Sequence, residues 1–289
     1  MQNSNIQPRG SSLALLQTTL LLLLLISQAQ AAVKTWDGSS SGNWATAANW
    51  TGNVAPVDGD DLVFPPGASN LVNTNNYTAL KVSSIIFTGS GYTLRGNALT
   101  VTNGISGQQA AGANTVGFSL TLGAAQTFDC VTAGASQSFS HITNSGFALT
   151  FSGSGNLTAG GVISGSGGVT KNGAGTLTYS GTRNTYTGTT RVNRGTLALG
   201  CSAVNDAFRG PLIISDGTGP AEVDLLLSEE IPNTTAVTVQ GGGTLNLNSH
   251  NETVGSLTLQ GGTVSSGTAT LTLDGNITVL ASSTTASIN

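Results

Sequence analysis

The sequence predicts an all-β chain that folds as a solenoid, with an atypical cap at its N-terminal end. Only 8% of the residues are charged, compared with about 25% in an average globular domain. Apolar residues alternate with Ser, Thr and Asn in many short runs, and glycine-rich steps separate the runs. Alternation with a period of two places apolar side chains on one face of a strand and hydroxyls on the other. Disorder is disfavoured because proline and charge, which usually enrich disordered chains, are both scarce here.

Residues 1–31 are expected to be a secretory signal peptide. Arg9 supplies a positive charge, residues 13–16 and 20–26 are apolar, and Ala29-Gln30-Ala31 has the pattern of a cleavage site. The apolar run is too short to span the ~30 Å core of a bilayer. We therefore expect a mature chain that begins near Ala32, has no transmembrane segment and is secreted or held at the cell surface.

Residues 32–80 are expected to form the N-terminal cap. All three tryptophans, Trp36, Trp44 and Trp50, lie in this segment. The terminal unit of a repeat array must be atypical, because it covers the core that the array would otherwise leave open. The alternative interpretation is a sugar-binding patch in which the three tryptophans are exposed.

Residues 81–289 are expected to form the repeat domain, with roughly ten coils of ~20 residues between positions 81 and 280. Glycine at the corners reaches positive φ at little steric cost. A β-sandwich is the alternative, since short and evenly spaced strands fit that fold too. Very short strands with Asn and Gly between them favour the solenoid, whose stacked coils would carry long outward ladders of Thr, Ser and Asn.

The clearest repeat covers residues 168–200. It opens with Lys171-Asn172-Gly173-Ala174-Gly175-Thr176-Leu177-Thr178, continues through Asn184-Thr185-Tyr186-Thr187-Gly188 and closes with Val192-Asn193-Arg194-Gly195-Thr196-Leu197. These three elements resemble the autotransporter-associated β-strand repeat, also called the passenger-associated transport repeat. Residues 253–264 look like the later coils of such proteins, and residues 36–64 are similar to their N-terminal segment. The resemblance implies a right-handed parallel β-helix and a passenger-type stalk exported to the cell surface.

Within this repeat, the alternation assigns each side chain a direction. Thr196 is expected to point outward, and Tyr186 to be a half-buried ring on the coil surface. Asn184 and Asn193 can occupy left-handed turn positions. The inward residues are Leu177, Val192, Leu197 and Leu199, and the corner glycines are Gly173, Gly175, Gly188 and Gly195.

The sequence departs from self-exporting members of the family at its C-terminal end. The residues leading to Asn289 resemble no translocation domain, so self-transport is not expected. Two interpretations stay open: a fragment of a longer protein, and a short secreted relative.

The acidic residues present no convergent catalytic set. Asp58, Asp60 and Asp61 are expected to lie in a solvated turn, without the ordered oxygen ligands of a calcium loop. Glu229 and Glu230 are expected to form an exposed bend, because isolated charge pairs are usually solvated. We therefore predict no catalytic, cofactor-binding or metal-binding residues and no cofactor.

The remaining chemistry-bearing residues support the same prediction. His141 and His250 lie far apart in the sequence, and a catalytic triad needs its members within reach of one another. Cys130 and Cys201 are either a disulfide or two buried small residues, and the sequence leaves both open. Tight binding to nucleic acid is excluded because the net charge is −4 and the nine basic residues are scattered.

These observations predict an exported, non-catalytic β-helical scaffold that is passenger-like and adhesive, with cell-surface or extracellular polymers as partners. Two alternatives stay open, because one fold hosts many functions. The first is a carbohydrate-active enzyme, either a polysaccharide lyase or a hydrolase, and the second is a sugar-binding module.

Overall fold

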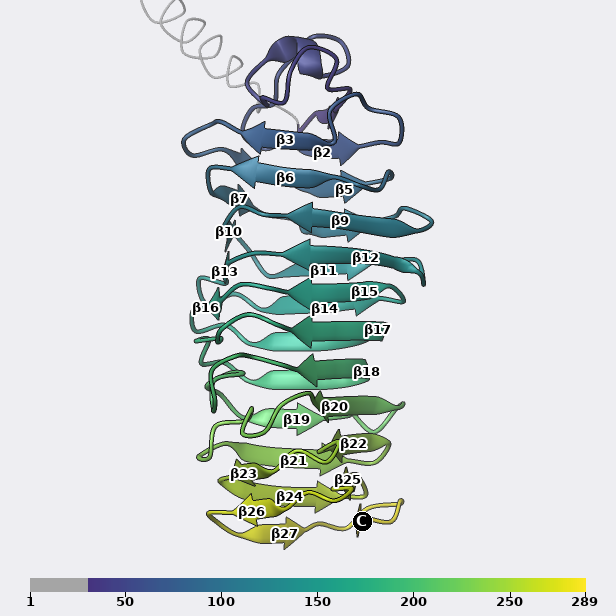
Figure 1. The fold of residues 1–289 in the computed structure, drawn as a ribbon, viewed down its shortest axis with the longest axis vertical. Helices are drawn as coiled ribbons and strands as arrows, with labels where there is room; N and C mark the ends of the chain where they lie inside the picture. The colour runs from purple at the N-terminus through teal and green to yellow at the C-terminus, as the bar shows by residue number, and fades with distance from the viewer. Residues whose placement is uncertain (1–30) are drawn as a thin grey trace, which may run out of the picture.

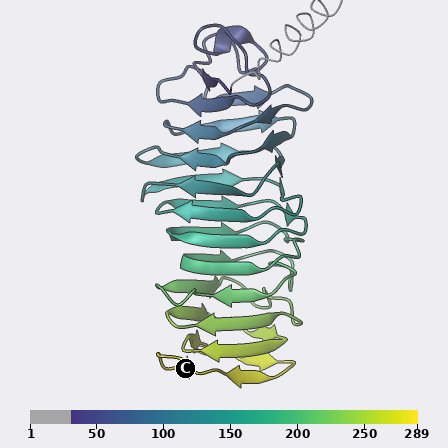
Figure 2. The same cartoon turned by 180° about the vertical axis from the view of Figure 1, so that it is seen from behind.

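A computed structural model describes residues 31–289, which fold as an all-β solenoid of about 11 turns (Figure 1). The expected signal peptide lies outside the described residues, apart from Ala31. All strand pairs between neighbouring turns are parallel (Figure 2). This arrangement confirms the predicted solenoid and excludes a sandwich of antiparallel sheets.

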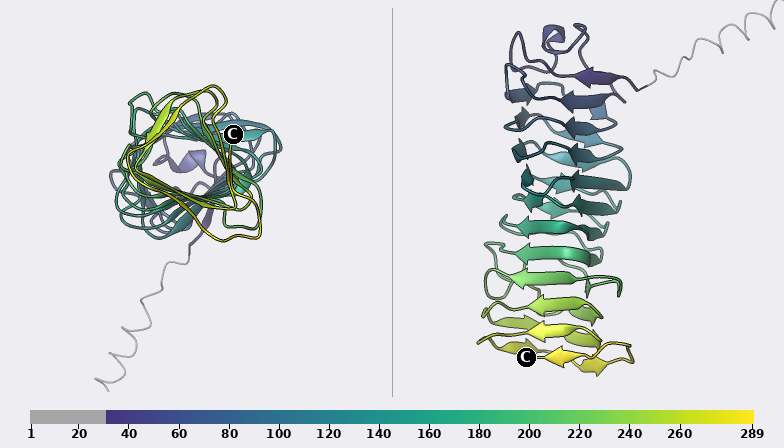
Figure 3. Two further views of the ribbon diagram at one scale, coloured as in Figure 1. Left: turned by 90° about the horizontal axis from the view of Figure 1, so that it is seen from below. Right: turned by 90° about the vertical axis from the view of Figure 1, so that its right-hand side faces the viewer.

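Each turn contributes strands to up to three stacks that surround one core (Figure 3). The first stack contains β1 (Val33–Thr35), β2 (Asp61–Phe64), β5 (Ile85–Phe87), β8 (Ile105–Gly107), β11 (Gln126–Cys130), β14 (Leu149–Gly153), the first half of β17 (Val169–Tyr179), the first half of β18 (Thr190–Leu199), β19 (Leu212–Ile214), β21 (Ala236–Gln240), β24 (Ser256–Gln260) and β27 (Ile277–Val279).

The second stack begins after the first corner of each turn. It contains β3 (Val72–Asn75), β6 (Thr93–Gly96), β9 (Gly112–Val116), β12 (Ala135–Phe139), β15 (Asn156–Ala159), the second halves of β17 and β18, β20 (Ala221–Leu225), β22 (Gly243–Asn246), β25 (Thr263–Ser265) and β28 (Ser287–Ile288). The third stack has shorter strands: β4 (Lys81–Val82), β7 (Leu99–Val101), β10 (Leu120–Leu122), β13 (Ile142–Thr143), β16 (Ile163–Ser164), and the separate pair β23 (Glu252–Val254) and β26 (Leu271–Leu273).

The length of a turn varies, although the register of its strands is kept. Ile85 pairs with Ile105, a turn of 20 residues, whereas Leu212 pairs with Val237, a turn of 25 residues. The extra residues lie in the loops between strands, as in the segment between β19 and β20. Loops on the outside of a solenoid can therefore grow without disturbing the core ladders.

The core consists of inward ladders that the alternation predicts. One ladder in the first stack runs through Leu62, Ile85, Ile105, Phe128 and Phe151, whose side chains are all buried. Leu177, Val192, Leu197 and Leu199 are buried as expected, and Thr196 is only half-buried on the outer face. A side chain at Gly173 would overlap the carbonyl oxygen of Gly153, so this corner brings two coils too close for any residue but glycine.

The N-terminal end of the solenoid is closed by a cap that includes the short 3-10 helix η1 (Ala47–Asn49), visible above β2 and β3 in Figure 1. Trp36, Trp44 and Trp50 are fully buried there, with ring centroids 5.1 Å apart for Trp36 and Trp50 and 6.2 Å apart for Trp44 and Trp50. Each indole N–H donates a hydrogen bond, for example from Trp44 to the Asn73 side chain at 2.7 Å. The predicted cap is confirmed, and its tryptophans have no face that a sugar could reach.

The parallel ladder already begins within residues 32–80. β1 pairs with β2, and β2 pairs with β5 beyond residue 81. The cap and the repeats therefore share one continuous sheet. The cap strands β1 and β2 lie before β5 in this ladder, so the backbone groups of β5 that face the N-terminal end have strand partners and are protected.

Candidate functional site

The outer surface of the second stack carries rows of hydroxyl groups. Thr115, Ser138, Thr158 and Thr178 occupy successive turns in register, and each is half-buried. Neighbouring strands lie about 4.8 Å apart, so the hydroxyls repeat at that spacing along the solenoid. These ladders, predicted from the alternation, give the solenoid a regular polar surface.

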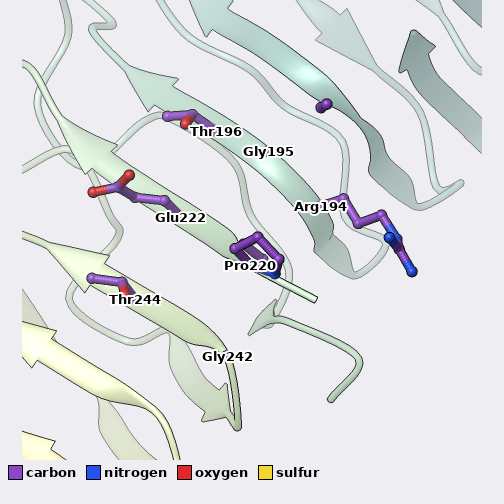
Figure 4. A pocket seen from close by; sticks show the side chains of 9 residues that line it. Arg194, Gly195, Thr196, Pro220, Glu222, Gly242 and Thr244 are labelled. Carbon is purple, nitrogen blue, oxygen red and sulfur yellow. The ribbon is translucent and has the colours of Figure 1, made fainter. Parts of the chain in front are cut away.

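A shallow cavity of about 280 Å³ interrupts this surface across β18, β20 and β22 (Figure 4). Thr196, Glu222 and Thr244 line it from three successive strands, and Arg194 and Pro220 lie at its edge. The Arg194 guanidinium donates to the Thr218 hydroxyl at 3.3 Å, and Asn246 donates to the Glu222 carboxylate at 3.1 Å. The two charged groups thus bind different neighbours.

Asp58, Asp60 and Asp61 of the cap do not converge on one point. Asp60 is buried, and its carboxylate accepts the N–H groups of Ala32 and Val57, each at 3.0 Å, with the Lys34 ammonium 3.8 Å away. The exposed Asp58 accepts from the N–H of Lys81 at 2.9 Å. Asp61 accepts from a hydroxyl of the next turn, Ser84, at 2.6 Å.

The prediction of a solvated turn is therefore wrong for Asp60. Its carboxylate joins the start of β1 to the cap, because two N–H groups at this corner have no strand partner and require an acceptor. Asp58 and Asp60 hold backbone N–H groups and Asp61 holds a side-chain hydroxyl, so all three have a structural role.

The prediction of an exposed bend is wrong for Glu230. This side chain is only 1% exposed, and its carboxylate accepts the N–H of Cys201 at 3.0 Å. Glu252, one turn later, accepts the N–H groups of Glu230 at 2.9 Å and Ile231 at 3.2 Å. Each carboxylate thus binds the backbone of the preceding turn where the third stack has no strand.

Burial changes the acid–base behaviour of both carboxyls. Loss of hydration raises the pKa of Glu230 to about 7, although the N–H of Cys201 opposes this shift. Burial likewise raises the pKa of Glu252 to about 8, against the opposing backbone N–H groups. The two groups therefore titrate near neutral pH from within the core.

Asn184 belongs to the same column of buried polar residues. Its side-chain oxygen accepts the N–H of Ile163 at 2.7 Å, and its amide donates to the carbonyl of Ala207 at 3.1 Å. Asn184 thus joins three successive turns. Neither Asn184 nor Asn193 has a positive φ, so the prediction of left-handed turns is wrong at both positions.

The two cysteines are free and buried. Burial raises the pKa of the Cys201 thiol to about 12 and that of the Cys130 thiol to about 11. A thiol that stays protonated at neutral pH is a poor nucleophile and a poor metal ligand. Both residues act as small core residues, the second of the two interpretations that the sequence left open.

The predicted surface position of Tyr186 is also wrong. Its ring is fully buried, and its hydroxyl lies 3.1 Å from the Tyr179 hydroxyl and 2.7 Å from that of Thr190. Burial raises the pKa of both tyrosines. The chain of three hydroxyls crosses the core where the third stack has no strand, between β17 and β18.

Lys171 is a buried residue that the sequence did not identify. It occupies an inward position between Phe151 and Val192, and its ammonium donates to the carbonyls of Gly173 and, at 3.2 Å, Arg194. Burial lowers its pKa to about 8. The two carbonyls lie where the register of β17 and β18 shifts, so Lys171 satisfies backbone groups that the strands leave free.

The histidines do not join any of these groups. His141 is exposed, and its Nδ1 accepts the N–H of Val162 at 3.1 Å. Across residues 31–289 there is no group of three or more His, Cys, Asp or Glu side chains that could hold a metal ion. In the same range, no helix has the length and apolar character needed to cross a membrane.

Two segments of these coils are similar to a known repeat family. A sequence model of the passenger-associated-transport-repeat family matches residues 169–199 and 237–265. These two segments are similar to passenger-associated transport repeats. The first transport repeat spans β17, its loop and β18, and the second runs from β21 to β25. A comparison with curated proteins and one with solved structures each gave no significant match.

Several polar residues of the first matched segment lie in the core. The first repeat contains Lys171, Asn184 and Tyr186, so its signature polar residues are core residues that satisfy backbone or hydroxyl groups. A signal for the missed carboxylates does exist in the sequence. Glu230 and Glu252 lie 22 residues apart, which is one turn of the solenoid.

Proposed function

We propose that this chain is an exported, non-catalytic scaffold, a passenger-like solenoid that presents polar ladders for adhesion or assembly outside the cell. The observation that carries the proposal is that both transport repeats are built into one continuous parallel ladder from β1 to β27. A rod of this kind places its surface at a distance from the membrane, and its partners would be cell-surface or extracellular polymers.

Three features of the described residues support a scaffold. The interior is filled by apolar ladders, and the buried polar side chains mostly bind the backbone. The buried carboxylates of Asp60, Glu230 and Glu252 accept backbone N–H groups, whereas acid–base work on sugars requires two carboxyls at a defined separation that are free to act on the substrate. The outer surface is hydroxyl-rich and carries little charge.

Export can be tested with the full chain in a Gram-negative host. We expect the leader to be removed, the mature N-terminus to lie near Ala32 by mass spectrometry, and the product to lie outside the inner membrane. A matched variant with Leu22→Arg and Leu24→Arg breaks the apolar segment and should be retained uncleaved in the cytoplasm. An uncleaved wild-type chain in the cytoplasm would contradict the proposal.

The non-catalytic part has its own test. We expect the purified mature chain to release no reducing or unsaturated ends from a panel of polysaccharides, relative to a heat-denatured sample. Release above that background would favour the carbohydrate-active enzyme.

A further inference from the structure

Two cavities follow the same corner of the solenoid, where each turn passes from the first stack to the second. The cavity of about 280 Å³ in Figure 4 borders a second cavity of about 620 Å³, and both share Pro220 and Gly242. The second cavity is also lined by Asp216 to Gly219, Gln240, Gly241, Gln260 and Ser282 to Thr284. We call the two together the corner groove.

The corner groove runs along the axis of the solenoid. It spans six successive turns, from Ala174 on β17 to the loop between β27 and β28. With about 4.8 Å between neighbouring strands, its length is about 24 Å. This shape suits a linear ligand that lies across the strands.

The loops at the edges of the groove are held in place. Ser215 has a positive φ of 73°, and its hydroxyl donates to the carbonyl of Gly241 at 2.8 Å and accepts the N–H of Gly217 at 3.0 Å. On the other side, the hydroxyl of Thr284 donates to the carbonyl of Gly261 at 2.9 Å. A groove with fixed walls loses little conformational entropy when a ligand binds.

Uncommitted amides line the floor of the groove. Gln240 and Gln260 pair in register on β21 and β24, and both are half-buried. Neither side-chain amide has a hydrogen bond within residues 31–289. Each amide offers donors and an acceptor, and the two are about one strand spacing apart.

The charges of the groove disfavour anionic polymers. Asp216 and Glu222 are acidic and Arg194 is the one basic residue among its lining residues. A peptide is also disfavoured, because an added strand needs an open sheet edge and β21 is already paired with β19 and β24. The ring of Pro220 adds a small apolar surface beside the amides.

We propose that the corner groove binds a neutral polysaccharide strand that runs along the solenoid axis. Sugar hydroxyls both donate and accept, so they match the paired amides of Gln240 and Gln260, and the C–H face of a sugar ring can pack on Pro220. This proposal names a ligand class for the proposed scaffold. It rests on the proposed function because only an exported chain would meet extracellular polysaccharides.

Affinity electrophoresis of the mature chain tests the proposal. Native gels would contain dextran, galactomannan, hydroxyethyl cellulose or, as the anionic probe, alginate. We expect at least one neutral polymer to retard the wild type, and Gln240→Ala with Gln260→Ala to weaken that binding about tenfold, because two hydrogen-bonding amides are lost. Gln108→Ala is the matched control, since Gln108 is exposed at the same corner but several turns away.

Retardation by a neutral polymer that the double variant loses and Gln108→Ala keeps would support the proposal. Three outcomes would overturn it: no retardation by any neutral polymer, retardation unchanged in the double variant, or retardation by alginate alone. The thermal melting of each variant is compared with that of the wild type to verify folding. Because the export test measures leader removal and location, failure of the groove and failure of the scaffold proposal remain distinguishable.

Discussion

The substitution Glu252→Gln should make the stability of the solenoid less dependent on pH. Burial raises the pKa of Glu252 from 4.5 to about 8. Because the folded-state pKa is raised, the contribution of the neutral Glu252 carboxyl to stability is fully present below pH 4.5 and is lost as the pH rises through about 8. The neutral carboxyl is thus tolerated in the core, and the carboxylate is not.

The pKa values set the size of the effect. Each unit of difference corresponds to about 1.4 kcal/mol, so ionisation of Glu252 costs the folded state on the order of 4 kcal/mol between pH 5 and pH 9. The amide introduced by Glu252→Gln carries no such cost. The introduced side chain keeps one hydrogen-bond acceptor, but its NH₂ group faces a backbone N–H. This mismatch costs about 1 kcal/mol at every pH. We therefore expect the wild type to be the more stable protein at pH 5 and Glu252→Gln to be the more stable one at pH 9.

Urea denaturation at pH 5, 7 and 9 measures this crossover, with hydrogen exchange of peptides from residues 226–265 as a local readout. The local readout matters because solenoid turns can unfold in part. Glu222→Gln is the matched control, since Glu222 lies on the outer face of the neighbouring turn and keeps its bond to Asn246 as an amide. A difference between wild type and Glu252→Gln that has the same sign at pH 5 and pH 9 would refute the reasoning.

Three further predictions test the packing. Leu197→Asp should lower the free energy of unfolding by several kcal/mol, which the urea midpoint reports. Thr196→Asp should lower it only weakly, and equal losses in the two variants would mean that the assigned register is wrong. Tyr186→Phe should cost about 1–3 kcal/mol, because two buried hydroxyls lose their partner; an unchanged melting temperature would show that the hydroxyl chain adds nothing. Deletion of residues 34–64 removes the tryptophans and bares the edge of β5, so size-exclusion chromatography should show association; a monodisperse monomer would remove the capping argument.

The features that the sequence predicted correctly are those that follow from local pattern along the chain. The alternation placed Leu197 inward and Thr196 outward correctly, because the direction of a side chain in a strand depends only on its position within the run. The tryptophan-rich segment was predicted as a cap because every open repeat array needs one. The repeat at residues 168–200 revealed the similarity to transport repeats because its pattern is long and ordered, and the family model matches the same segment.

The candidate site was predicted less well. The hydroxyl ladders follow from the alternation, but the corner groove depends on loops such as the one between β19 and β20, whose course the pattern of strands does not determine. The pairing of Gln240 with Gln260 could be read from two similar runs 20 residues apart, yet their exposure in a groove could not.

The sequence by itself determined the fold class, the cap and the direction of the strand residues, because these depend on neighbours along the chain. Only the tertiary structure decided that Lys171, Tyr186 and Glu230 lie in the core. Charge or a hydroxyl ordinarily indicates the surface, and that preference was overcome at the corners of the coil. Lys171 and Glu230 bind backbone groups that have no strand partner there, and a buried polar side chain costs less than leaving those groups without a hydrogen bond. The hydroxyl of Tyr186 is instead satisfied by the hydroxyls of Tyr179 and Thr190.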